Sequence, residues 1–138
     1  MGCKCLLENR VLPQWVVILQ TPVALLDLSS LESLVSDDNT GLLSLFGAFN
    51  LQKLAVPKLT TVDIFYLDQN EELQDWDLSG LTDITTEITI TKNPKLPSCL
   101  VDHLVNQVQF SGPKQEVDGL KQGCNCNEID GKFEAVCP

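Results

Sequence analysis

A spaced apolar pattern occurs twice in the middle of this chain, and it limits what the chain can fold into. Val56, Leu59 and Val62 are matched further along by Leu78, Leu81 and Ile84 at one constant interval. Asn70 and Leu73 are matched by Asn93 and Leu96 at an interval that is one residue longer. A fixed period of this kind, about 22 residues, indicates stacked units, none of which buries its apolar face without a neighbour. Such a stack offers an extended surface, which suits binding better than catalysis.

Short β-prone runs lie at comparable intervals along the chain: Trp15 to Leu19, Leu42 to Phe46, Ile64 to Asp68 and Glu87 to Thr91. The first interval between these runs is the longest, and the next two are nearly equal. Leucines at short spacing follow each run. We therefore expect the runs to stack as one parallel sheet, while each return path crosses the other side of the stack.

Strand alternation assigns a face to each residue of these runs once the two asparagines are aligned. Phe65 and Leu67 then lie level with Ile88 and Ile90, and all are expected to point inward. The alternate positions form an outer face, which we predict to be the binding surface: Phe46, Ile64, Tyr66, Asp68, Glu87, Thr89 and Thr91. Two exposed aromatic rings rimmed by carboxylates would make a recognition patch there.

Asn70 and Asn93 are expected to have a structural role in the turns that follow the third and fourth runs. Asn tolerates left-handed backbone angles, and its side-chain amide hydrogen-bonds turn backbone that would otherwise be unpaired. The sequence therefore predicts that both amides stabilise turns rather than contact a ligand.

The C-terminal part of the chain has a different pattern, which predicts a cap on the stack. Val101, Leu104, Val105 and Val108 form one apolar helical face, and Ser98 is placed to cap the helix. The remainder is polar and rich in cysteine. We expect a single domain over residues 1–138, with a leading segment at 1–14, β-repeats at 15–97 and a helical, Cys-rich cap at 98–138.

The six cysteines lie near the two ends of the chain, as Cys3, Cys5, Cys99, Cys124, Cys126 and Cys137. This distribution favours disulfides that pin the ends of a secreted domain. Cys99 is well placed to pair with one of the last three, and the sequence leaves the partner open. Free thiols and a metal site are the alternatives. Structural zinc sites, however, space their paired ligands more widely than the cysteines are spaced here.

Charge excludes some partners. The net charge is −10, from 9 Lys plus Arg against 19 Asp plus Glu, and the lysines are scattered among carboxylates. Nucleic acid and anionic membrane surfaces are therefore poor partners. The apolar stretch from Trp15 to Leu28 is interrupted by Gln20 and Pro22, so we expect no transmembrane segment in this chain.

The string from Leu78 to Cys99 resembles a known family. Leu78, Leu81 and Ile84 are followed by Ile88-x-Ile90-x-x-Asn93-Pro94-x-Leu96-Pro97-x-Cys99, which is similar to the receptor L domain. That domain occurs in insulin and EGF receptor ectodomains, and related repeats occur in bacterial surface lipoproteins. The resemblance implies a mainly β, short right-handed β-solenoid of about four leucine-rich coils with a capped end. It also implies recognition outside the cell, with no shared catalytic motif.

Two motifs suggest chemistry, and neither is complete. Asp75-x-Asp77-x-Ser79-Gly80-x-x-Asp83 matches part of an EF-hand calcium loop, but position 12 is Thr86 where the loop needs a bidentate Glu. His103 follows Asp102 and lies one helical turn after Cys99, but no oriented base or oxyanion site accompanies it. We therefore expect no catalytic residue, no metal and no cofactor.

These features together predict a non-catalytic recognition or structural domain at the cell surface or outside the cell. Its ligand would be a protein or a glycan. The alternatives are a hydrolase or calcium-dependent module built on a solenoid scaffold, and a terminal fragment of a larger surface protein.

Overall fold

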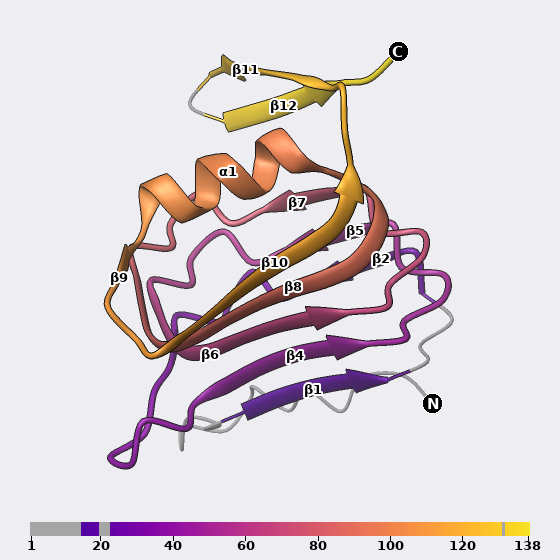
Figure 1. The fold of residues 1–138 in the computed structure, drawn as a ribbon. Coiled ribbons are helices and arrows are strands. Elements are labelled where there is room, and N and C mark those ends of the chain that lie inside the picture. The colour runs from indigo at the N-terminus through magenta and orange to yellow at the C-terminus, as the bar shows by residue number, and fades with distance from the viewer. Residues whose placement is uncertain (1–14, 20–22, 131) are drawn as a thin grey trace.

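Two parallel β-sheets pack against an aliphatic core in the computed structural model, which describes residues 15–19, 23–130 and 132–138 (Figure 1). The protein is mainly β, with α1 (Ser98–Gln107) as the α-helix of these residues. A separate antiparallel hairpin, β11 (Asn125–Ile129) and β12 (Lys132–Val136), forms the C-terminal end. Neither parallel sheet closes on itself.

The large sheet contains the strands that the β-prone runs predict. Its order is β1 (Trp15–Leu19), β4 (Leu42–Phe46), β6 (Thr61–Asp68), β8 (Asp83–Pro97) and β10 (Lys114–Lys121), all parallel. Two short strands, β3 (Ser33–Leu34) and β9 (Gln109–Phe110), pair with the beginnings of β6 and β8. The predicted bounds of β1 and β4 are confirmed, whereas β6 and β8 both begin earlier than their runs.

The small sheet lies behind the large one and consists of β2 (Leu25–Asp27), β5 (Lys53–Ala55) and β7 (Asp75–Asp77) (Figure 1). The chain passes from one sheet to the other and back, so consecutive strands of the same sheet are parallel. After β8 the chain forms α1 instead of a fourth small-sheet strand, and α1 lies beside β7 with the hairpin above it (Figure 1). The crossing paths between large-sheet strands therefore contain strand segments that the leucine spacing alone did not predict.

The predicted register of the large sheet is confirmed. Phe65 pairs with Ile88 and Leu67 with Ile90, and all of these side chains are fully buried. Trp76 from β7 meets Phe65 edge to face, with 6.1 Å between ring centroids, so the two sheets share one core. Trp76 is a core residue, since only 8% of it is exposed. Each buried aliphatic or aromatic side chain of this kind stabilises the fold by about 1.5–3 kcal/mol.

Asn70 and Asn93 link successive turns through their side chains, as predicted. Asn70 Oδ1 accepts the Ala48 N–H at 3.0 Å, and Asn70 Nδ2 donates to Asn93 Oδ1 at 2.9 Å. Asn93 Nδ2 in turn donates to Leu67 O at 3.1 Å. The left-handed backbone, however, lies at the residue before each asparagine, at Gln69 and Lys92, with φ of 60° and 57°.

The helix at the end of the core agrees with the apolar pattern but not with its predicted cap. Leu100, Val101 and Leu104 are buried beneath α1. Pro97 precedes the helix and no side chain caps it, so the prediction that Ser98 is the N-cap is wrong. Ser98 is already the first helical residue, and its Oγ donates to Gln122 Oε1 at 3.4 Å.

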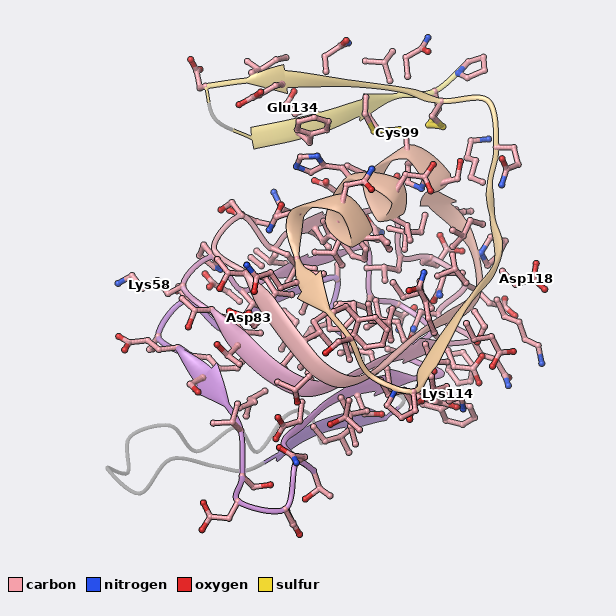
Figure 2. The ribbon with its side chains drawn as sticks, turned by 60° about the vertical axis from the view of Figure 1, so that its left-hand side comes forward. Lys58, Asp83, Cys99, Lys114, Asp118 and Glu134 are labelled. Atoms are coloured by element: carbon pink, nitrogen blue, oxygen red, sulfur yellow. A yellow bond between two sulfur atoms is a disulfide. The ribbon has the colours of Figure 1, made fainter. Side chains whose placement is uncertain are left out.

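Two disulfides hold the hairpin at this end of the fold. Cys99 on α1 bonds to Cys126 on β11, and Cys124 bonds to Cys137 beyond β12. Figure 2 shows Cys99 at the end of α1 that faces the hairpin. The prediction that Cys99 pairs with one of the last three cysteines is confirmed. Cys3 and Cys5, and the leading segment at 1–14, lie outside the described residues.

Candidate functional site

The predicted binding residues lie on one face of the large sheet, in rows that cross the strands. Ile64 pairs with Glu87, Tyr66 with Thr89 and Asp68 with Thr91. Phe46 on β4 pairs with Asp68 and so belongs to the last of these rows. The side chains at alternate positions are buried in the core, which leaves these residues on the opposite face.

These residues differ in how much of the side chain reaches the surface. Phe46 is 40% exposed, and Ile64, Tyr66 and Glu87 are half-buried. Asp68, Thr89 and Thr91 are only 8%, 3% and 8% exposed, because short side chains inside a wide sheet are covered by their larger neighbours. The part of the face available for contact is therefore centred on Phe46 and Tyr66, while the threonines form its floor.

Asp68 accepts hydrogen bonds from three neighbouring side chains on this face. Its Oδ1 accepts a hydrogen bond from Thr91 Oγ1 at 2.7 Å, and its Oδ2 accepts weaker ones from Tyr66 OH and Gln69 Nε2 at 3.5 and 3.4 Å. Burial raises the pKa of the Tyr66 hydroxyl above its usual value of 10.0, and the negative charge of Asp68 raises this pKa further. Tyr66 is therefore a neutral hydroxyl at physiological pH, held beside a carboxylate.

Strand β10 widens this face with charged residues that the sequence analysis did not assign to a strand. Lys114 pairs with Glu87, Glu116 with Thr89 and Asp118 with Thr91. Lys114 Nζ lies 3.5 Å from Glu87 Oε2. The sequence pattern does not predict β10, because this strand lacks apolar alternation. The position of β10 along the chain is a signal that could have found it. Lys114 follows its β8 partner Glu87 by the same number of residues that separates the first residues of β1 and β4, which are also paired.

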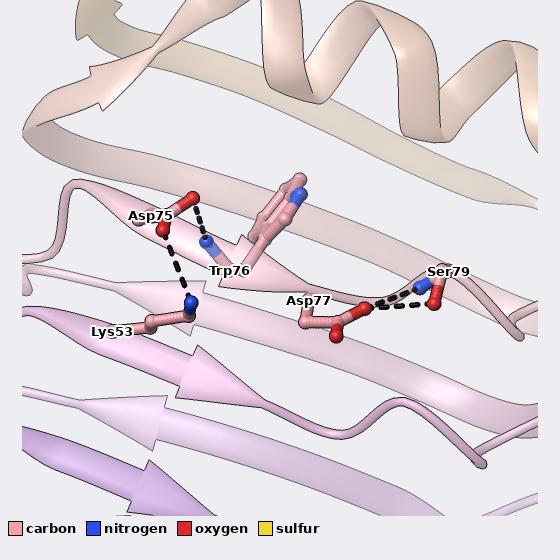
Figure 3. A network of polar contacts seen from close by, with 5 residues as sticks. All are labelled: Lys53, Asp75, Trp76, Asp77 and Ser79. Carbon is pink, nitrogen blue, oxygen red and sulfur yellow. Dashed lines mark hydrogen bonds and ion pairs between the residues drawn. The ribbon is translucent and has the colours of Figure 1, made fainter. Parts of the chain in front are cut away.

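The segment that resembles an EF-hand loop lies on and after β7, and its carboxylates are engaged with neighbouring residues (Figure 3). Asp75 Oδ1 accepts the Trp76 N–H at 2.9 Å, while Asp75 Oδ2 lies 3.5 Å from Lys53 Nζ. Asp77 Oδ1 accepts hydrogen bonds from the N–H and Oγ of Ser79 at 3.2 and 2.8 Å. No group of three or more metal-binding side chains occurs among the described residues.

His103 and Cys99, the other candidates for chemistry, are held apart by their contacts. The Cys99 sulfur is in a disulfide, so it is not a thiol nucleophile. The His103 ring stacks on Phe133 of β12, with 3.4 Å between centroids and 9° between planes. His103 therefore helps to hold the hairpin on α1.

A small polar hollow of about 150 Å³ lies where β7, α1 and β12 meet. It is lined by polar side chains from Lys53, Asp75, His103, Gln107 and Glu134, together with Trp76. Gln107 Nε2 donates to the carbonyl oxygens of Leu78 and Leu81 at 2.9 and 2.7 Å, which fixes the side chain at the rim. No local sequence pattern predicts this site, because its residues come from elements that are far apart in the chain.

Comparisons of the chain with protein-family models, with curated proteins and with solved structures find no match. No helix in the described part of the chain has the length and apolar character needed to cross a bilayer. The two disulfides are consistent with a secreted or extracellular protein.

Proposed function

We propose that this protein is a non-catalytic recognition domain that binds its ligand on the outer face of the large sheet. The observation that carries the proposal is the pair Phe46 and Tyr66, which present aromatic surface on a sheet whose other face is buried in the core along β4, β6 and β8. Aromatic residues are enriched at protein interfaces, where they supply large contact areas with few rotatable bonds. A rigid sheet holds them in place without an ordering cost on binding.

The charge of this face defines the ligand further. Asp68, Glu87, Glu116 and Asp118 outnumber Lys114, the one cation among the residues that the described strand pairings place on these rows. An anionic ligand would be repelled, whereas a basic protein surface or a hydroxyl-rich glycan would be matched. This charge pattern supports a ligand whose contact surface carries hydrogen-bond donors.

We further propose an L-domain-like β-solenoid as the architecture and the extracellular space as the location. The alternation between two parallel sheets supports the first proposal, because a solenoid needs a return strand for each turn. The disulfides support the second, because such bonds persist in oxidising compartments.

The test compares the wild-type protein with the double variant F46A/Y66A on glycan arrays and on a panel of cell-surface ectodomains. We expect the variant to keep its circular dichroism spectrum and to lose binding to any ligand that the wild type recognises. Lys58→Ala is the matched control, because Lys58 is exposed and lies outside the large sheet (Figure 2). Equal binding by the wild type and the folded double variant would overturn the proposal.

A further inference from the structure

The polar hollow between β7, α1 and β12 contains a hydrogen-bond donor without a protein partner. Trp76 is more than nine-tenths buried, with 8% of its surface exposed, and it lines the hollow. Its backbone N–H donates to Asp75, but no protein atom of the described residues accepts a hydrogen bond from its indole Nε1–H. Figure 3 shows the indole rising from β7 toward α1, with its nitrogen on the part of the ring remote from the strand.

This unpaired donor keeps some contact with solvent. Among the described residues, no wholly buried side-chain nitrogen or oxygen lacks a hydrogen-bond partner, so Nε1 is not one of the wholly enclosed atoms. A polar group that is largely buried is costly unless it is hydrogen-bonded. The acceptor for Nε1 therefore comes from outside the described protein atoms, and the hollow that Trp76 lines is a place where it can enter.

Acceptors and donors are mixed around this group. Asp75 and Glu134 supply carboxylate oxygens, and Lys53 supplies an ammonium group 3.5 Å from Asp75. Gln107 is held by the two hydrogen bonds from its Nε2, which leaves its amide oxygen as a further acceptor. Carboxylates outnumber ammonium groups at these positions, which disfavours anions such as phosphate or a ligand carboxylate.

We propose that the polar hollow is a binding site for one neutral sugar residue. A hydroxyl group accepts a hydrogen bond from an N–H and donates one to a carboxylate, so a polyol satisfies the Trp76 donor and the surrounding acceptors together. The hollow of about 150 Å³ equals the liquid volume of about five water molecules, which suits a single ring rather than an extended chain. The site is separate from the outer face of the large sheet.

The test follows the indole N–H resonances in ¹H–¹⁵N NMR spectra. The chain has two Trp residues, and Trp15→Phe assigns their two signals. Galactose, glucose, mannose and N-acetylglucosamine are each titrated to about 50 mM, because ligands this small bind in the millimolar range. We expect at least one sugar to move the Trp76 signal saturably while the Trp15 signal stays in place, with inorganic phosphate and glycerol having no effect.

Two variants make the assignment specific. Asp75→Asn and Glu134→Gln are each expected to weaken sugar binding at least tenfold, whereas Lys58→Ala is expected to leave it unchanged. Glu134 is exposed, so E134Q still tests the site if D75N fails to fold.

A Trp76 signal that no sugar moves would overturn the proposal. Equal shifts with glycerol, or wild-type affinity in folded E134Q, would overturn it as well. The variant F46A/Y66A tests the outer face separately, because neither Phe46 nor Tyr66 lines the hollow.

Discussion

Replacing Asn70 by alanine is expected to lower the free energy of unfolding by about 2–6 kcal/mol. The change leaves the N–H of the fully buried Ala48 without its acceptor, which costs about 1–3 kcal/mol. It also removes the bonds from Asn70 Nδ2 to Leu45 O and to Asn93 Oδ1, each with a net contribution of about 0.5–1.5 kcal/mol. A domain of this size is stable by about 5–15 kcal/mol, so the loss is a large fraction of the total.

The assay is urea-induced unfolding followed by circular dichroism, with the disulfides kept oxidised. Asn50→Ala is the matched control, because Asn50 is exposed and its replacement should change stability by less than about 0.5 kcal/mol. Asn70→Asp keeps an acceptor for the Ala48 N–H but places a carboxylate against Asn93 Oδ1, so it should be more destabilising at pH 7 than at pH 3. If N70A and N50A unfold at the same urea concentration, with the same dependence on urea, the linking role of Asn70 is refuted.

Three further perturbations test other parts of the structure. Tyr66 is the single tyrosine in the chain, so absorbance near 295 nm follows the ionisation of its hydroxyl, and the midpoint of this titration should lie above pH 10.0. Asp68→Asn should lower the midpoint only in part, because burial is the larger cause of the raised pKa. The folded state holds the Tyr66 hydroxyl proton more tightly than the unfolded chain does, so the contribution of Tyr66 to folding stability is complete below pH 10 and is lost as the pH rises above it. A titration midpoint at or below pH 10.0 would contradict this. The double variant C99S/C126S should lose about 2–4 kcal/mol of stability in urea unfolding and should increase hydrogen exchange in the hairpin; exchange confined to other strands would argue against the disulfide as its anchor. Gly47→Ala should cost about 1–2 kcal/mol by thermal unfolding, because its φ of 64° is left-handed while an added Cβ would meet no atom of the described residues within 4 Å; a neutral result would show that the backbone relaxes there.

Strands β1, β4, β6 and β8 of the large sheet, and the register of β6 with β8, could be predicted because their signals are local and repeated. Alternating apolar residues mark Phe65, Leu67, Ile88 and Ile90 as inward, and matching Asn70 with Asn93 aligns them. Each apolar pattern is short, but adjacent units carry the same pattern, so the units support one another's assignment. The small sheet could not be predicted in this way, because its strands are too short to show alternation.

The end of the fold was harder to predict than its middle. Strand β10 carries charged residues and is exposed along most of its length, so it has no apolar pattern. Charges of this kind are typical of edge strands, where they oppose pairing with other chains. The cysteine pairing was also open, because it depends on how the hairpin lies on α1.

The sequence by itself determined which residues point into the core and which lie on the outer face, because that division depends only on strand alternation and on a spacing within the chain. Tertiary structure alone decided how exposed each outer residue is: Thr89 and Thr91 are covered by neighbours on adjacent strands, whereas Phe46 is not. It also created the polar hollow, in which Trp76, Gln107 and Glu134 meet from segments far apart in the chain. Such a site depends on how separate elements pack, and no local pattern in the sequence records that packing.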